Sequence, residues 1–96
     1  MGADFTSIRN FHERSVCEAV TVAAPRYPGV QDDGELLADV ACVALNRMHP
    51  RYIRHEVDFA FYQSDRERSE TERQLTEAVE FAFGFVQARA AMRARR

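Results

Sequence analysis

The sequence contains no lysine, only two cysteines and four glycines, and no long hydrophobic run. Two widely separated cysteines exclude a disulfide framework and a Cys-x-x-Cys metal knuckle, so we expect Cys17 and Cys42 to be small buried hydrophobic residues. The scattered glycines form no phosphate-binding loop. No segment approaches the roughly 20 apolar residues of a membrane span, and the N-terminus lacks the apolar region of a signal peptide, which predicts a cytoplasmic protein without membrane insertion.

The charged residues also limit the class of protein. All 13 cations are arginines against 15 acidic residues, which gives a net charge of −2 at pH 7. Such a protein has no global basic field to draw it onto DNA or RNA, so we expect no nucleic acid polymer as a partner. With 96 residues, 46 % of them hydrophobic, the chain suits one small domain over residues 1–96. Residues 1–6 form a lead, and the Arg-rich tail at 90–96 is expected to fray.

Hydrophobic spacing predicts two helices in the first half of the chain. The first extends from Ile8 to about Ala24, with Ser7 as its N-cap. The second extends from about Gly34 to Met48 and is capped by Asp32 or Asp33. Apolar residues occupy almost every side of this helix, which is typical of a central helix or of a helix at an oligomer interface.

A long helix is predicted from about Asp65 to Arg89 or beyond, opened by a capping box of Ser64 and Glu67. Its predicted apolar stripe comprises Leu75, Ala78, Val79, Ala82, Phe85 and Val86. Before it, YIRHEVDFAFY at 52–62 alternates apolar and polar residues, which predicts a strand. No second strand of comparable strength is predicted, which favours pairing with a symmetry mate. The expected fold is therefore a mainly α, small single domain of three to four helices with one short extended segment, as a dimer.

The histidines and nucleophiles show no catalytic or metal-binding pattern. His12 lies on the apolar face of its predicted helix and His55 on the apolar side of the predicted strand, so we interpret both as core residues. Candidate nucleophiles such as Cys17 and Ser64 have no general base at the spacing of a recognisable motif. We therefore expect neither an enzyme nor a metal protein.

One group of polar residues has two interpretations. Asp39 and Asn46 fall on one stripe of the second helix, and Arg47, Arg51 and Tyr52 follow at or just past its end. In the structural interpretation, Asp39 pairs with an arginine, Asn46 caps the turn and Tyr52 begins the strand. In the functional one, the group binds a guanine nucleotide: Arg binds phosphate or the guanine O6/N7 edge, Asp accepts from N1–H and N2–H, and Tyr stacks. Spacing alone leaves both open.

Two segments resemble a known family. DVACVALNRMHPRY, from Asp39 to Tyr52, resembles the Asp-x-x-Ala-x-Ala-Leu-Asn-x-Leu-Pro-Pro-x-Tyr signature of the late competence development ComFB family, and NFHERSV from Asn10 resembles its Asn-x-x-Glu-x-x-Val element. The resemblance implies a small helical homodimer that binds cyclic di-GMP, or cyclic di-AMP, in control of motility, competence or cell size. It also implies that Asp39, Asn46, Arg51 and Tyr52 bind the ligand, and our spacing argument adds Arg47.

The sequence departs from that pattern in two places. Some family members have a zinc-binding cysteine cluster before the motif aspartate, where this chain has GVQDDGELLA, so zinc is not carried over. His49 replaces one of the prolines and puts an ionisable ring beside the expected site. The resulting expectation is a non-enzymatic cyclic dinucleotide receptor that needs no cofactor and acts through an unidentified protein. The alternative is a dimeric protein-interaction adaptor without a small ligand, in competence or motility regulation.

Overall fold

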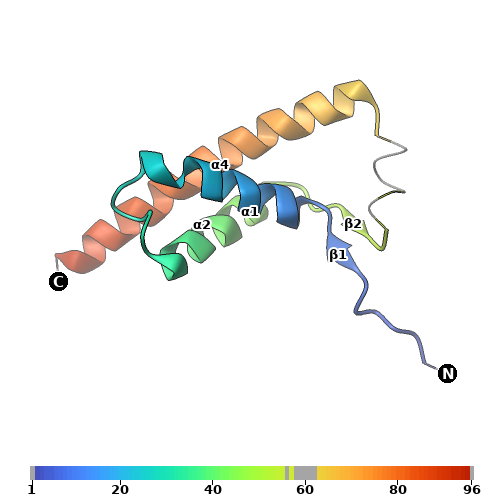
Figure 1. The fold of residues 1–96 in the computed structure, drawn as a ribbon, viewed down its shortest axis with the longest axis horizontal. Helices are drawn as coiled ribbons and strands as arrows, with labels where there is room; N and C mark the ends of the chain where they lie inside the picture. The colour runs from blue at the N-terminus through green and yellow to red at the C-terminus, as the bar shows by residue number, and fades with distance from the viewer. Residues whose placement is uncertain (1, 56, 58–62, 96) are drawn as a thin grey trace.

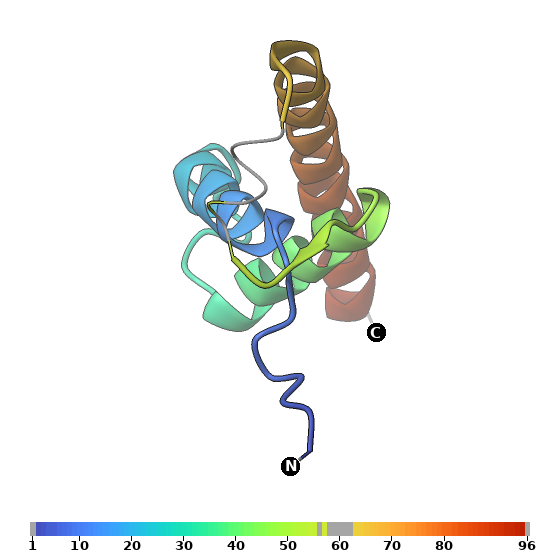
Figure 2. The ribbon, with the colours of Figure 1, turned by 90° about the vertical axis from the view of Figure 1, so that its right-hand side faces the viewer.

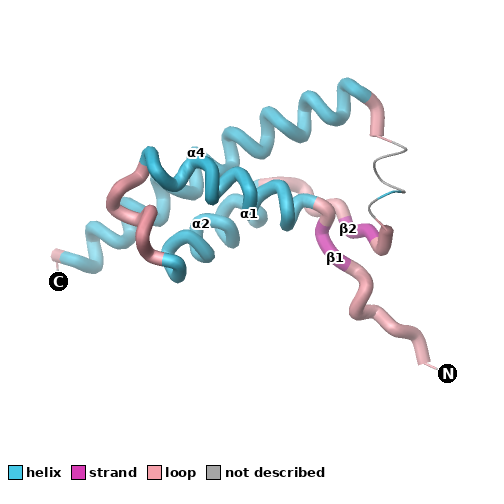
Figure 3. Tube along the Cα trace, in the orientation of Figure 1, coloured by secondary structure: helices cyan, strands magenta, loops and turns pink. Residues whose placement is uncertain are grey.

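The computed structural model describes residues 2–55, 57 and 63–95, and the structural statements below refer to these residues. In chain order the elements are β1 (Arg9–Asn10), α1 (His12–Ala23), the 3-10 turn η1 (Ala24–Arg26), α2 (Gly34–Arg47), β2 (Tyr52–Ile53) and α4 (Asp65–Ala94). Helices dominate the described chain, which confirms the predicted mainly α class (Figure 3).

Within the described ranges, helices α1 and α2 pack against each other and against the middle of α4. Helix α2 contacts both α1 and α4, as expected for a central helix. The first turns of α4 stand clear of α1 and α2 (Figures 1 and 2), and residues 64–70 are all exposed. The middle of the long helix is therefore anchored in the core, while its first turns extend past the start of α1.

The first helix begins later than predicted. Ser7 lies in a turn and caps no helix, because the next residues, Arg9 and Asn10, form the extended strand β1. That strand pairs with β2 in antiparallel register, Arg9 opposite Ile53 and Asn10 opposite Tyr52. The prediction of a helix from Ile8 was therefore wrong, since a local periodicity argument does not include a strand partner from beyond α2.

The same ladder corrects the expectation of strand pairing between two copies. Strand β2 covers only Tyr52–Ile53, and its partner belongs to the same chain. Arg54, His55 and Val57 are not in a strand. The rest of the predicted strand, at 56 and 58–62, lies outside the described residues. The strand argument for a dimer is therefore lost.

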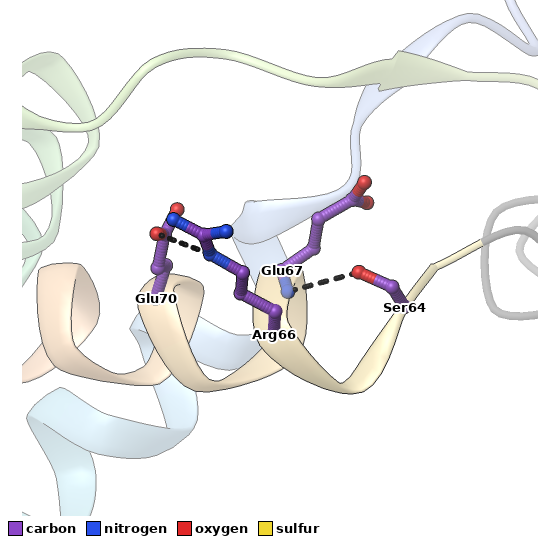
Figure 4. A network of polar contacts seen from close by, with 4 residues as sticks. All are labelled: Ser64, Arg66, Glu67 and Glu70. Carbon is purple, nitrogen blue, oxygen red and sulfur yellow. Dashed lines mark hydrogen bonds and ion pairs between the residues drawn. The ribbon is translucent and has the colours of Figure 1, made fainter.

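The starts of α2 and α4 agree with the sequence. Asp33 is the N-cap of α2, and its Oδ1 accepts hydrogen bonds from the N–H groups of Glu35 and Leu36 at 3.0 and 3.1 Å. Ser64 caps α4, and its Oγ accepts from the Glu67 N–H at 3.1 Å (Figure 4). Each cap satisfies amide groups that have no partner within the helix. Helix α2 ends at Arg47, one residue before the predicted end, and α4 continues through Ala94.

The core forms where the three helices meet. Buried there are Val16 and Val20 of α1, Val40 and Ala44 of α2, and Ala78, Val79, Ala82, Phe83 and Val86 of α4. The predicted stripe on α4 is confirmed at its buried members but is wrong at Phe85, which is exposed, and it omits Phe83, which is completely buried. At 100° per residue Phe83 lies beside Val79 and Val86, whereas Phe85 is turned away from them. Phe83 stacks on Tyr27 with ring centroids 4.1 Å apart.

Three side chains that we expected in the core are at the surface instead. Cys17 and Cys42 are both exposed, so their interpretation as buried hydrophobic residues was wrong. Cys17 comes directly after the buried Val16, and Cys42 comes shortly after the buried Val40. Because successive residues of a helix are rotated by about 100°, each cysteine lies on a different side of its helix from that valine. His55 is also exposed, because the strand whose apolar side it was assigned to ends at Ile53.

Candidate functional site

The predicted site residues do not converge in one chain. Asp39 lines a groove of about 160 Å³ between α2 and α4, opposite Arg89 and Arg93. Arg51 lines a different cavity at the other end of α2. Helix α2 separates the two positions, and neither lining set contains a residue of the other.

The remaining predicted residues lie between and beside these cavities. Asn46 is exposed on α2, and Tyr52 is exposed on β2. The Arg47 guanidinium lies over the ring of Phe81, with its Cζ 3.8 Å from the ring centroid. That distance is within the range of a cation–π interaction, so the structure gives Arg47 a packing contact on α4.

The cavity at Arg51 is a polar cleft of about 330 Å³, which we call the Arg51 cleft. It lies between the start of α1, the segment that follows α2 and the first turns of α4. Its lining residues are His12, His49, Pro50, Arg51, Gln63, Glu67, Glu70, Thr71 and Gln74. One wall thus carries a guanidinium and two imidazoles, and the opposite wall carries two carboxylates with amide and hydroxyl groups.

A smaller and less polar cavity of about 180 Å³ adjoins this cleft, and we call it the Phe11 pocket. Phe11, Met48 and Leu75 give it an apolar lining, while Arg68 and Glu72 add charges from α4. The two cavities share His12, Gln63 and Thr71 as lining residues. A ligand with a charged part and a flat apolar part would therefore find both environments side by side.

His12 lies at the boundary of the two cavities and is 6 % exposed. Burial lowers its pKa below the ordinary histidine value, and the positive charge of Arg51 lowers the pKa further, whereas a hydrogen bond with the His49 backbone acts in the opposite direction. At neutral pH the imidazole is therefore uncharged and has one donor and one acceptor nitrogen. The burial of His12 was predicted, but its position in a cleft was not.

The backbone of Arg51 is fixed by the residues before α1. The Oδ1 of Asn10 accepts hydrogen bonds from the N–H groups of His12 at 3.2 Å and Arg51 at 3.1 Å. In addition, the Phe11 N–H donates to the Arg51 carbonyl oxygen at 2.6 Å. The start of α1 and the segment after α2 are thus held together, which places the Arg51 side chain at the cleft although the residue itself is exposed.

The carboxylates across the cleft come from the exposed first turns of α4. Glu70 lies 3.6 Å from Arg66 in an i,i+4 pair along the helix (Figure 4). This pair is strongly exposed, and such pairs contribute little to stability because water and salt screen them. Glu70 can therefore exchange that contact for one with a ligand. Glu67 donates its N–H to the Ser64 cap and also lines the cleft.

The donor set of the Arg51 cleft suits a ligand with anionic and N–H groups. Arg51 can bind a phosphate through two parallel hydrogen bonds, and Glu67 and Glu70 can accept from N–H groups. Within the described ranges, no group of three or more His, Cys, Asp or Glu side chains could hold a metal ion. The helices among the described residues also include none that is long and apolar enough to cross a membrane.

Several lining residues were not found from the sequence. The sequence predicts a solvated, charged face at the start of α4. Thr71 and Gln74 lie on that face, and Gln63 lies just before it. The available signal was the spacing Gln63, Glu67, Glu70, Thr71 and Gln74, which recurs at three and four residues and therefore describes one side of α4. A polar stripe of this kind is common on exposed helices, so it does not identify a cleft without the position of α1.

Comparison with protein families identifies one match that covers most of the chain. Residues 9–90 match the family described as late competence development protein ComFB. A comparison with curated proteins found no match. The matched range begins at β1 and ends near the C-terminal end of α4, so it includes every residue that lines the Arg51 cleft.

Proposed function

Because this chain belongs to the late competence development ComFB family, we propose that it is a non-enzymatic receptor for a cyclic dinucleotide and that it prefers cyclic di-GMP to cyclic di-AMP. Family membership itself suggests a competence-related regulatory role. The receptor would transmit the signal through a protein partner. The observation that carries the proposal is the Arg51 cleft, with its cationic wall, its carboxylate wall and the Phe11 pocket beside it.

Each part of a guanine nucleotide has a matching group in these cavities. The Arg51 fork suits a phosphate, and the His49 ring supplies a further polar group beside it. Glu67 and Glu70 suit the N1–H and N2–H edge of guanine, which presents donors to a carboxylate. The Phe11 pocket offers apolar and aromatic surface to a base.

The size and symmetry of the ligand favour two copies of the protein. A cavity of about 330 Å³ is at the lower end of the range for small-molecule sites and suits part of a cyclic dinucleotide better than the whole. A two-fold ligand matches a two-fold dimer, in which the same residues are presented twice. In such a homodimer the second copy would supply the other cleft.

The other residues of the predicted site lie outside this cleft. Asp39 faces Arg89 and Arg93, Arg47 packs on Phe81, and Asn46 and Tyr52 are exposed. Their roles in ligand binding stay predictions from the family resemblance. Under the present proposal, Arg51 is the residue of that set with the largest effect on affinity.

Isothermal titration calorimetry with cyclic di-GMP tests the proposal, with cyclic di-AMP and GTP as comparison ligands. We expect saturable binding that Arg51→Ala weakens by about 1–3 kcal/mol or more, the range of a lost bidentate contact. Arg26→Ala is the matched control, because Arg26 is an exposed arginine of η1, at the opposite end of α1. It should leave the affinity unchanged.

The alternative function is a protein-interaction adaptor with no small ligand, and the exposed start of α4 favours it as the second candidate. The titration separates the two functions. No heat and no thermal stabilisation with any of the three nucleotides would contradict the receptor and favour the adaptor. Equal weakening by Arg51→Ala and Arg26→Ala would contradict the assignment of the Arg51 cleft.

A further inference from the structure

The buried imidazole of His12 has no role in the ligand contacts proposed above. The ring is 6 % exposed, yet His12 lines both the Arg51 cleft and the Phe11 pocket. A ligand that occupies both cavities therefore comes to lie against His12. An imidazole at such a position can change its charge when a charged ligand arrives.

Without a ligand, the His12 ring is uncharged at neutral pH. Burial and the positive charge of Arg51 lower its pKa, whereas a hydrogen bond with the His49 backbone raises it. A hydrogen bond has this effect when a ring N–H donates to a carbonyl oxygen, because such a bond favours the charged ring. The second ring nitrogen is then an acceptor, which repels an anionic oxygen and becomes a donor only on protonation.

Charged and titratable groups face His12 from both segments that surround the start of α1. Within the described residues these are His49 and Arg51 after α2, and Glu67, Arg68, Glu70 and Glu72 on α4. The two arginines disfavour a proton on His12, and the three carboxylates favour one. The pKa of His12 is nevertheless lowered, so burial and Arg51 outweigh the carboxylates in the protein alone.

An anionic ligand reverses this balance. A phosphate bound by Arg51 offsets the positive charge that opposes protonation, and it adds a negative charge about as close to His12 as the guanidinium is. Because His12 is already almost completely buried, the ligand removes little further water from the ring. The protonated ring can also donate a charge-assisted hydrogen bond to an anionic oxygen, and such bonds are stronger than neutral ones.

We propose that the Arg51 cleft binds its ligand together with one proton, which His12 takes up. The inference rests on the proposed function and adds a form of regulation to it, because ligand and proton then favour each other's binding. The bound ligand raises the pKa of His12. The affinity should therefore rise as the pH falls through the pKa of the ligand-bound protein, and it should level off below the lower pKa of the free protein.

Isothermal titration calorimetry with cyclic di-GMP at pH 7.5, 6.5 and 5.5 tests the coupling. A phosphodiester has no second ionisable proton, so the charge of the ligand stays constant over this range. We expect the wild-type dissociation constant to fall by about fivefold or more from pH 7.5 to 5.5, within the limit of about tenfold per pH unit for one proton. Repetition in buffers with different ionisation enthalpies measures the proton uptake directly, and circular dichroism checks that the protein is folded at each pH.

Histidine variants assign the proton. His12→Gln should lose the pH dependence, whereas His55→Gln is the matched control and should retain it, because His55 is exposed and does not line the cleft. His49 lines the cleft, so His49→Gln is measured as well, and it should also retain the pH dependence. Protonation of Glu67 or Glu70 would weaken their contacts with N–H groups, which is an effect of the opposite sign.

The outcomes separate this inference from the proposed function. Wild-type binding with the same affinity at all three pH values, or a His12→Gln variant with the wild-type pH dependence, would overturn the inference and leave the receptor function intact. No binding at any pH would contradict the receptor function, and the inference with it.

A second measurement needs no substitution of His12. The chain has three histidines, so His49→Gln and His55→Gln assign the imidazole C–H resonances in a nuclear magnetic resonance titration of pH. Saturating cyclic di-GMP should raise the pKa of His12. Without the ligand, Arg51→Gln should raise it too, because the variant removes the charge that opposes protonation. A pKa of His12 that is the same with and without bound ligand would overturn the proposal.

Discussion

The side-chain oxygen of Asn10 accepts a hydrogen bond from the backbone N–H of Arg51, 41 residues further along the chain, at 3.1 Å. The same oxygen accepts from the N–H of His12 in the first turn of α1. One amide oxygen therefore accepts the first N–H of α1 and also holds the segment that carries Arg51. The two family-like segments of the sequence, one beginning at Asn10 and one ending at Tyr52, meet at this contact and in the β1–β2 ladder.

Replacement of Asn10 should therefore destabilise the protein more than its partial exposure suggests. Asn10→Ala removes an acceptor from two N–H groups, and we expect it to lower the free energy of unfolding by about 1–3 kcal/mol. Asn46→Ala is the control, because Asn46 is exposed on α2 and alanine has the higher helix propensity. Urea denaturation of both variants measures the difference. Equal stabilities for the two would contradict the role of Asn10.

Protonation of His12 should destabilise the fold at acidic pH. Its folded-state pKa lies below the unfolded value of about 6.5, so the unfolded chain binds the proton more tightly. The contribution of neutral His12 to stability is therefore complete above that pH and is lost progressively as the pH falls below it. Urea denaturation at pH 7.5 and 5.5 should show a larger loss for the wild type than for His12→Gln. His55→Gln, which replaces an exposed histidine, should retain the wild-type loss. A wild-type loss no larger than that of His12→Gln would contradict this prediction.

The Phe83–Tyr27 stack should be the most sensitive aromatic contact in the core. Phe83 is completely buried against Tyr27, so Phe83→Ala leaves a cavity and should cost about 3–5 kcal/mol of unfolding free energy. Phe5→Ala, at an exposed position of the lead, should change it by less than about 0.5 kcal/mol. Thermal and urea unfolding give both values. A small effect of Phe83→Ala would contradict the burial of Phe83 against Tyr27.

Both cysteines should react in the native protein. Cys17 of α1 and Cys42 of α2 are exposed, so each thiol should titrate with a chromogenic disulfide reagent without denaturant. Cys17→Ser and Cys42→Ser, one at a time, assign the two reactions and should change stability little. Protection of either thiol until the protein unfolds would show that its helix face is covered in solution.

Sequence reasoning succeeded where the determining interactions are local. The caps at Asp33 and Ser64 act over three residues or fewer, and the period of the buried side of α4 is a property of one helix. Both could therefore be read from neighbouring residues. The end of α2 before His49–Pro50 was also predicted to within one residue, since the residue before a proline is disfavoured in the helical region.

Sequence reasoning failed where contacts join distant segments. The start of α1 is decided by the pairing of Arg9 and Asn10 with Tyr52 and Ile53, and that pairing lies beyond any local pattern. The candidate site was predicted only at Arg51, because its opposite wall belongs to α4. The wrong prediction at Phe85 has another cause. An apolar residue at helical spacing is compatible with the core and with an exposed apolar face, and only the burial of Phe83 shows which side of α4 faces the core.

The most direct test of the Arg51 cleft is an amide chemical-shift titration of the labelled protein with cyclic di-GMP. If the cleft binds the ligand, the largest saturating shifts should occur at His12, Arg51, Gln63 and Thr71, and Arg51→Ala should need a higher concentration of cyclic di-GMP to produce them. The amides around Asp39, in the groove with Arg89 and Arg93, should move little. No saturating shifts, or shifts confined to the Asp39 groove, would contradict the assignment of the ligand to the Arg51 cleft.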